Sequence, residues 1–569
     1  MNDSGAAGLT AGAISARIDR LPATRTIWTM VVLLGFGMFF ELYDLLFSAY
    51  VAPSLVKSGV LTARTAGLFG TTGVASFIAA LFTGLFIGTI LCGFLADRYG
   101  RRAIFTWSLL WYSAANIMVA LQTDAFGLNA WRLVSGVGLG LEMVTIGAYL
   151  SELAPKGLRG RAFAVNQAIG FVCVPIISFL AYRLVPTAPL GIEGWRWVVL
   201  IGALAAPVVV FLRRGLPESP RWLAKHGRLA EADRVLGAIE AKVAAEYGRP
   251  LPPPGPEEPV SPASRFVDLF APGVRGRLIL MSVFNIFQTI GYYGFNNWVP
   301  SLLVKQGITV STSLGYTTVI ALAAPVGPLL GFLLGDRFER KWIIVAAAGL
   351  ILVCGLVFSQ TRDSGPIIAM GVGLTLGANI MSYSFHAYQQ ELFATGIRAR
   401  AAGFVYSWSR LSVIFSSFII AFVLEDFGAV GVFVFIAAAM GVVMATIGLF
   451  GPRTTNLALE KIAPWEAEED TVLDTNKLGK NVFAVGFVGC LASVLWWYHF
   501  YSQVNRFMSA GSSPVPIDCL FSNSGACGFV TGVASAAGVF AYNPMLLWLS
   551  AALLAVGIII MSSTKKAQP

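Results

Sequence analysis

Long apolar blocks recur along the chain, and short polar connections separate them. A helix needs roughly 20 apolar residues to cross the hydrocarbon layer of a membrane, which is about 30 Å thick, and most of these blocks reach that length. We place twelve of them at about 27–51, 73–96, 103–122, 131–151, 163–183, 196–212, 278–301, 315–335, 342–360, 366–389, 401–424 and 429–450. The pattern predicts an all-α integral membrane protein made of two six-helix halves.

Polar stretches separate the two halves and follow the second one. The interval after residue 212 is rich in Lys and Arg and contains the proline-rich run 250–256, so it cannot cross a bilayer. We therefore expect a cytoplasmic segment 1–25, a first half 26–212, a central cytoplasmic loop 213–276, a second half 277–452, a cytoplasmic linker 453–480 and an extension 481–569.

The extension contains two further strong apolar blocks, at about 481–501 and 545–562, which gives about two extra transmembrane helices. On this count the segment between them faces the periplasm, where Cys519 and Cys527 are able to oxidise to a disulfide. The alternative makes the Gly- and Ala-rich piece 525–542 a further helix or a re-entrant segment.

Composition agrees with a membrane protein and excludes several other classes. Charged residues make up 12% of the 569 positions, against roughly 25% in soluble domains, and 56% are hydrophobic. The net charge of +10 arises from Lys and Arg in the loops of one side, as the positive-inside rule requires, so it does not indicate nucleic-acid binding. The loop charges place both termini in the cytoplasm, and residues 1–25 lack the apolar stretch of a cleavable signal peptide. Nothing in the sequence resembles a metal site, a cofactor site or an enzyme's nucleophile, and we expect a monomer in contact with lipid.

The two halves repeat in sequence with a shift of 239 positions. This shift relates Asp97 to Asp336, and it also relates Glu152 to Glu391. Charged residues at the cytoplasmic ends of neighbouring helices are able to form a network that holds the halves together and opens when they rock apart. The alternative is that they only anchor helix ends and fix orientation. The residues assigned to this cytoplasmic gate are Asp97, Arg98, Arg101, Arg102, Glu152, Arg159, Arg161, Asp336, Arg337, Arg340, Lys341, Glu391, Arg398 and Arg400.

The stretch 93–102 resembles the loop motif of the major facilitator superfamily, and 335–341 is a partial copy. The run Leu216–Leu223 is similar to a motif of the sugar porters and of related metabolite carriers, and the resemblance covers roughly 25–460. The fourth block, at Gly136–Glu142, resembles organic-acid and nicotinate-type carriers more than sugar porters, apart from Leu141. The seventh block lacks the sugar porters' full Gln-Gln plus Asn signature. The resemblance implies secondary active transport by alternating access.

Acidic and basic residues inside the apolar blocks are candidates for proton coupling, because a charge at bilayer depth costs at least about 2.5 kcal/mol unless it faces a partner or a cavity. Glu41 and Asp44 lie three apart on one helical face, at a depth similar to that of Arg132. If Arg132 faces Asp44 it stabilises the ionised carboxylate, and moving it away favours uptake of a proton. Glu142 is a further member of this group. The resemblance agrees, since proton-coupled sugar porters pair an acid of the first helix with an Arg of the fourth. A static ion pair is the alternative.

Arg410 lies near mid-depth in the eleventh block and is a candidate for binding a carboxylate, for which its guanidinium offers a planar fork. Organic-anion carriers of the related branch use a basic residue in this helix. The alternative is that Glu142 neutralises Arg410. Polar residues of the seventh and tenth blocks are expected to line the same site: Gln288, Tyr292, Tyr293, Asn296, Asn297 and His386.

Together these features predict an inner-membrane secondary transporter, a proton-coupled symporter that imports a small organic acid or related metabolite. A proton-coupled sugar transporter, a drug or metabolite efflux antiporter and a non-transporting sensor with the same fold are the alternatives.

Overall fold

The computed structural model divides the chain into two compact units, Met1–Trp465 and Glu466–Pro569. It describes residues 10–62, 65, 72–91, 95, 98–204, 208, 215–256, 269–335, 337–393, 397–454, 475–507 and 517–521, and single positions from 527 to 558. The first unit contains the helical bundle, and the second contains the C-terminal extension.

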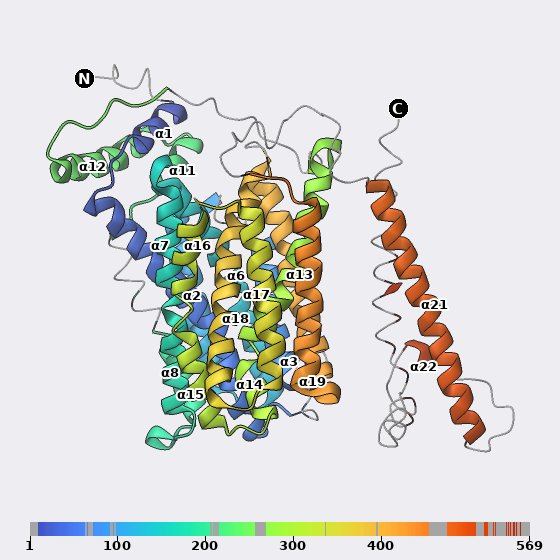
Figure 1. The fold of residues 1–569 in the computed structure, drawn as a ribbon. Coiled ribbons are helices and arrows are strands. Elements are labelled where there is room, and N and C mark those ends of the chain that lie inside the picture. Colours follow the sequence, from blue (N-terminus) through green and yellow to red (C-terminus); the bar gives the residue numbers. More distant parts are fainter. Residues whose placement is uncertain are drawn as a thin grey trace. The chain divides into compact units, whose positions relative to one another are not determined.

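The first half of the bundle consists of helices that match the expected apolar blocks (Figure 1). Their bounds are α2 (Arg25–Lys57), α3 (Gly73–Leu91), α5 (Arg101–Leu121), α6 (Ala125–Leu153), α7 (Arg159–Phe171), α8 (Cys173–Leu184) and α9 (Gly194–Gly202). α7 and α8 together fill the fifth block and form one candidate span. Most of the sixth block beyond α9 lies outside the described residues.

The second half repeats this arrangement. Its helices are α13 (Pro272–Asn296), α14 (Val299–Lys305), α15 (Val310–Ala321), α16 (Val326–Gly335), α17 (Arg340–Gln360), α18 (Ser364–Glu391) and α19 (Arg398–Phe450). The eleventh and twelfth blocks both lie in α19, which changes direction at Gly428 (φ 65°, ψ −165°). Glycine suits this position because a side chain disfavours a positive φ. Across the described ranges, nine helices have the length and hydropathy to cross a membrane.

Glycines bring α3 and α6 into backbone contact. A Cβ on Gly84 would lie 2.1 Å from the carbonyl oxygen of Leu133, and one on Gly140 would lie 2.4 Å from that of Leu85. Gly88 and Gly136 are equally confined, so each helix presents two small residues four positions apart. Small residues allow close packing of helices in a membrane, where the hydrophobic effect does not drive association. The glycine-rich run of the fourth block therefore has a structural role.

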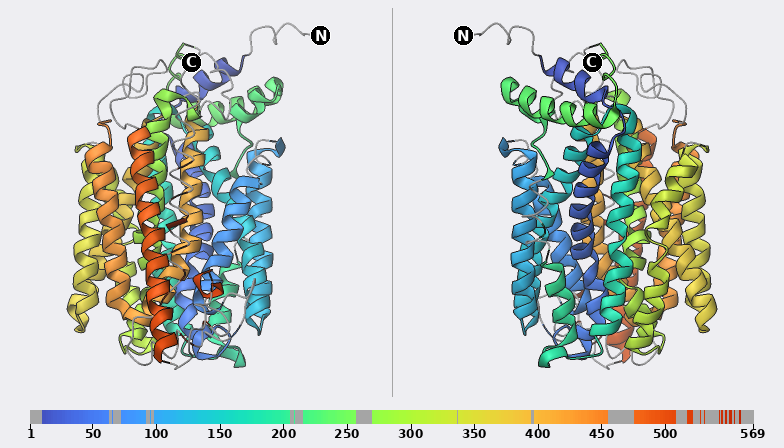
Figure 2. Two further views of the ribbon diagram at one scale, coloured as in Figure 1. Left: turned by 90° about the vertical axis from the view of Figure 1, so that its right-hand side faces the viewer. Right: turned by 90° about the vertical axis from the view of Figure 1, so that its left-hand side faces the viewer.

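A small layer of three helices covers one end of the bundle. Figures 1 and 2 show α1 (Ala11–Asp19), α11 (Pro220–Lys225) and α12 (Leu229–Tyr247) there. Arg17 forms ion pairs with Asp233 and Glu240, both at 2.6 Å, and Arg20 pairs with Glu240 at 2.7 Å. The N-terminal segment thus folds onto the central loop.

Asp19 connects this layer to the transmembrane helices. Its carboxylate accepts hydrogen bonds from the Lys156 backbone N–H and from Arg221, both at 2.7 Å, and it lies 3.5 Å from Arg159. Arg159 is one of the predicted gate residues. Burial of Ile14 and Ile18 stabilises α1.

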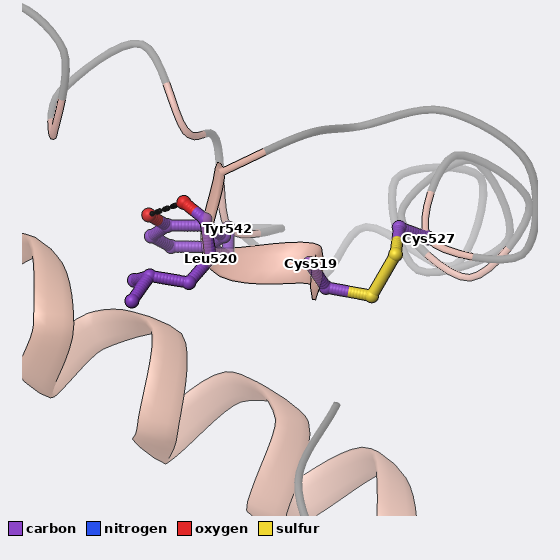
Figure 3. Close-up of a disulfide and its surroundings, with 4 residues drawn as sticks. All are labelled: Cys519, Leu520, Cys527 and Tyr542. Atoms are coloured by element: carbon purple, nitrogen blue, oxygen red, sulfur yellow. Dashed lines mark hydrogen bonds between the residues drawn. A yellow bond between two sulfur atoms is a disulfide. The ribbon is translucent and has the colours of Figure 1, made fainter. Parts of the chain in front are cut away.

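The second unit contains α21 (Thr475–Phe507) and the short helix α22 (Asp518–Phe521). The expected disulfide between Cys519 and Cys527 is formed, with the two Cα atoms 5.4 Å apart (Figure 3). The Tyr542 hydroxyl donates to the Leu520 carbonyl at 2.9 Å. α21 includes the block expected at 481–501, whereas most of 525–542 and 545–562 lies outside the described residues.

Acid is expected to loosen α1. Burial alone would raise the pKa of Glu240, but hydrogen bonds from Arg17 and Arg20 outweigh it and hold the pKa below its usual range. A carboxyl of this kind contributes stability above its usual pKa and loses it as the pH falls through the lowered value. We expect amides of residues 11–19 to exchange hydrogen several-fold faster at acidic than at neutral pH, after correction for intrinsic rates.

Glu240→Gln should produce the same faster exchange at neutral pH. Glu231→Gln is the matched control, because Glu231 pairs with Arg228, three positions earlier in the chain, and not with α1. Equal protection of α1 in wild type and Glu240→Gln would contradict the prediction.

Candidate functional site

A buried ion pair joins α2 to α6. The Arg132 guanidinium lies 2.7 Å from the Asp44 carboxylate, and both side chains are at most 1% exposed. Arg132 also donates to the Asp44 carbonyl oxygen and to the Ser48 hydroxyl, the latter at 2.9 Å. The geometry brings together the two residues that depth counting placed at the same level.

Neutral donors complete the surroundings of this pair. Asn116 on α5 donates to one Asp44 oxygen at 2.8 Å, and the Ser135 hydroxyl donates to the other at 2.9 Å. The Arg132 guanidinium also lies 4.0 Å from the centre of the Phe47 ring. A buried ion pair is stable when such hydrogen bonds satisfy its remaining lone pairs and protons. Sequence reasoning missed Asn116 and Ser135, although a polar residue inside an apolar block was an available signal.

Glu41 and Glu142 differ from Asp44 in their surroundings. They are 1% and 0% exposed, and none of their carboxylate oxygens has a hydrogen-bond partner within the described structure. Glu41 lies in electrostatic range of Glu142 and of Arg410. A buried polar group without a partner is costly, so this pair requires a further explanation.

Arg410 on α19 is 1% exposed and forms hydrogen bonds with neutral groups. It donates to the hydroxyls of Tyr293 and Tyr406 at 2.9 and 2.8 Å, and to the sulfur of Met143 at 2.8 Å. Among the described residues, no carboxylate lies within ion-pair distance of it. The alternative pairing of Glu142 with Arg410 is therefore absent from this conformation.

Met143 shows where Arg410 lies in the molecule. Met143 belongs to α6 in the first half, whereas Arg410, Tyr293 and Tyr406 belong to the second half. The ring of Phe82 on α3 also packs 4.9 Å from that of Tyr293. Arg410 thus sits at the boundary between the two halves, where a moving substrate site is expected in a carrier.

The other residues predicted to bind substrate on α13 differ in burial and in hydrogen bonding. Gln288, Tyr292 and Asn297 are buried, and the side-chain oxygen of Asn297 has no described partner. Asn296 donates to the carbonyl of Tyr292 in its own helix at 2.9 Å.

His386 joins the Arg410 cluster through Tyr406. Its ring lies 5.3 Å from that of Tyr406, and its Nδ1 lies 2.6 Å from the Ser382 carbonyl oxygen. Tyr406 is one helical turn from Arg410, a spacing that would have indicated the contact from sequence.

The start of α5 and the end of α6 contain an ion pair and a helix cap. Arg101 pairs with Glu152 at 3.0 Å. The Glu218 carboxylate accepts the backbone N–H groups of Arg101 and Arg102 at 3.0 and 3.2 Å, so it caps the start of α5. Burial raises the pKa of Glu218, against the lowering effect of these donors. Gly100 (φ 101°) permits this approach, since a Cβ there would lie 2.6 Å from a Glu218 oxygen.

The second half repeats these contacts at the shift of 239. Arg340 pairs with Glu391 at 2.8 Å, as Arg101 does with Glu152. The Tyr149 hydroxyl donates to the Pro217 carbonyl, and the equivalent Tyr388 donates to that of Pro452.

The loop after each of these helices repeats as well. Arg159 donates to the carbonyl of Ala154 at 3.4 Å, and Arg398 donates to that of Phe393 at 3.1 Å. The internal repeat thus extends to individual hydrogen bonds.

The remaining gate residues differ in exposure. Arg98, Arg161, Arg337 and Arg400 are exposed, Arg102 is half-buried, and Lys341 donates to the Gly451 carbonyl at 2.8 Å. Asp97 and Asp336 lie outside the described residues. The ion pairs Arg101–Glu152 and Arg340–Glu391 each join helices of one half.

Two repeated helical halves around buried charges define a major facilitator carrier. Comparison with known proteins agrees: the model of the sugar (and other) transporter family matches residues 29–465. The chain belongs to this family, whose members are transporters and not enzymes, and it is a multi-pass inner-membrane protein.

Individual relatives cover most of the chain. The putative metabolite transport protein YyaJ of Bacillus subtilis is 34% identical over 445 residues, which cover 77% of this chain and 95% of that protein. The niacin transporter NiaP of Acinetobacter baylyi is 28% identical over 454 residues, 79% of this chain and 99% of that protein. Among solved structures, the proton:xylose symporter XylE, from E. coli, superposes with a TM-score of 0.60 at 19% identity, over 77% of this chain and 99% of that one.

Breaking the repeated ion pairs should slow transport without weakening substrate binding. Arg101→Ala and Arg340→Ala each remove an ion pair between helices of one half that does not involve Arg410, so each half should move less well as a rigid unit while the site stays intact. We expect uptake into proteoliposomes to slow several-fold, with equilibrium affinity within about twofold of wild type.

Arg161→Ala is the matched control, because it removes the same charge from an exposed position in the first turn of α7. If Arg101→Ala transports at the wild-type rate, these residues serve only to anchor helix ends.

Proposed function

We propose that this chain is a proton-coupled symporter that imports a small organic acid by alternating access. The observation that carries the proposal is the buried Arg410, whose guanidinium lies between the halves, donates to tyrosine hydroxyls and forms no ion pair with a described carboxylate. A carboxylate of a substrate is the natural partner for such a group. The niacin transporter among the relatives handles a small molecule of suitable size, which supports this class.

Proton coupling is assigned to the ion pair between Asp44 and Arg132. Both residues belong to the first half, so rocking of the halves need not separate them. A small shift of α2 against α6, or entry of water, would weaken the pair and leave a carboxylate buried without its partner. Binding a proton relieves that cost. XylE, which shares the fold, is a proton:xylose symporter, and this analogy supports the mechanism.

The orientation follows from the basic loops. We place the layer formed by α1, α11 and α12 in the cytoplasm, together with both termini, because Lys and Arg concentrate at that end of the helices. The carrier is proposed to act as a monomer.

Asp44→Asn should abolish accumulation of substrate driven by a proton gradient. Exchange of labelled for unlabelled substrate should persist, since exchange need not cycle the proton. The measurement is uptake by proteoliposomes with and without an imposed gradient, which also separates symport from antiport and from a sensor that does not transport. The compound used in these assays is first identified by a thermal-shift screen of the purified protein against small acids, sugars and vitamins.

The control is Glu193→Gln, which removes a carboxylate from an exposed loop pair with Arg196. Full accumulation by Asp44→Asn would remove Asp44 from the coupling step.

Arg410→Ala should weaken binding of the acid by roughly 10- to 150-fold, because a charge-assisted pair worth about 1.5–3 kcal/mol is lost. Arg410→Lys keeps the charge but not the fork, so its affinity should fall between those of wild type and Arg410→Ala. An analogue with an amide in place of the acid should bind wild type weakly and lose little more in Arg410→Ala. Affinities are measured by titration calorimetry.

Arg228→Ala is the control, since it removes a guanidinium from an exposed pair with Glu231 outside the candidate site. If Arg410→Ala binds the acid as tightly as wild type, or if the transported compound is uncharged, the sugar transporter becomes the better interpretation.

A further inference from the structure

Two buried glutamates lie beside the proposed site outside regular hydrogen-bond geometry, although the Tyr112 hydroxyl on α5 interacts with Glu142. Glu41 on α2 and Glu142 on α6 are buried, and all four of their carboxylate oxygens lack a partner in the described structure. Asp44 is one turn from Glu41, and its carboxylate accepts bonds from Arg132, Asn116 and Ser135. α2 therefore places the Asp44 carboxylate among donors that stabilise its charge and the Glu41 carboxyl where no such donors are found.

The titratable groups that face these glutamates come from five helices. Glu41 and Glu142 act on each other, and Arg410 is the cation in range of Glu41. The other titratable groups that interact with one or both of them are Asp44 on α2, Tyr112 on α5, Cys173 on α8 and Tyr406 on α19. Arg410 forms no hydrogen bond with either glutamate, because its bonds go to Tyr293, Tyr406 and Met143.

An ionised carboxylate in this position is unfavourable for two reasons. Desolvation without a compensating hydrogen bond or ion pair costs several kcal/mol per ion in a protein interior. Two like charges in range of each other add repulsion. The neutral acid avoids both costs.

We propose that Glu41 and Glu142 form a second proton-binding site, separate from the Asp44–Arg132 pair, and that its protons balance an organic anion bound at Arg410. This inference rests on the proposed function for the anion but not for the protons. It implies that more than one proton crosses the membrane with each anion.

The charge balance of the buried region explains the coupling. Asp44 and Arg132 neutralise each other, so with both glutamates protonated the region keeps the single positive charge of Arg410. A bound monovalent anion then makes the region neutral. If the anion leaves, loss of a proton from one glutamate restores neutrality. Anion and proton thus favour each other's binding, and by linkage the effect is reciprocal.

Infrared spectroscopy of the purified full-length protein in lipid nanodiscs tests the protons directly. Protonated carboxylic acids have a C=O stretching band that carboxylates lack. We expect wild type to show this band at neutral pH and to lose it on alkaline titration. Glu41→Gln and Glu142→Gln should each remove part of it, and the double variant should remove most. Glu193→Gln, which changes an exposed loop carboxylate, should leave the band unchanged.

The wild-type spectrum alone is decisive even if a variant does not fold. Absence of any protonated-acid band at neutral pH would overturn the proposal, and so would a band that both Gln variants retain in full.

Addition of benzoate, as a probe anion, separates this inference from the proposed function. At a pH where wild type has begun to lose the band, benzoate should restore it in wild type but not in Arg410→Ala. Restoration in both proteins overturns the link to Arg410. If benzoate has no effect on wild type while the band behaves as expected, the proton site stands and the anion proposal fails.

Discussion

The cost of a charge inside a bilayer governs the organisation of this protein. No water is available at that depth, so each buried charge must be paired, hydrogen-bonded or neutralised. Three solutions occur within a few turns of one another. Asp44 and Arg132 pair and are completed by neutral donors. Arg410 is surrounded by hydroxyls and a sulfur, and Glu41 and Glu142 have no described partner. These differences in surroundings distinguish groups that look alike in the sequence.

Backbone packing makes these differences possible. The glycines of α3 and α6 allow the two helices to touch along their backbones, which fixes the α6 face that carries Arg132, Ser135 and Glu142. Bulkier residues would hold the helices apart, and the distances within the ion pair would change with them. The glycine-rich run of α6, which resembles a family motif in the sequence, thus sets the distance between α3 and α6.

Much of the architecture was predictable, because apolar length and loop charge are one-dimensional signals. The same holds for Asp44 and Arg132, since rise per residue gives depth, and two charges at one depth in neighbouring helices have few other partners. Depth alone did not predict the contacts of Glu142 and Arg410. They lie at similar depths, but the rotation of α6 about its axis directs Met143 and not Glu142 to the guanidinium. Rotation depends on packing against several helices at once, which a single sequence does not encode locally. The cap formed by Glu218 was missed for a related reason, because it joins segments more than 110 positions apart.

The repeat clarifies how the two halves divide their roles. At the helix ends that carry the repeated ion pairs they are equivalent down to single hydrogen bonds: Arg101–Glu152 repeats as Arg340–Glu391, and Tyr149 repeats as Tyr388. In the middle of the membrane the equivalence ends. The buried acids Glu41, Asp44 and Glu142 belong to the first half, whereas Arg410 and the tyrosines bonded to it belong to the second. Symmetric ends let the two halves move in the same way. In the mechanism we propose, the asymmetric centres let one half carry protons while the other presents a cation to the substrate, so that movement of one half against the other changes the field that each ligand experiences.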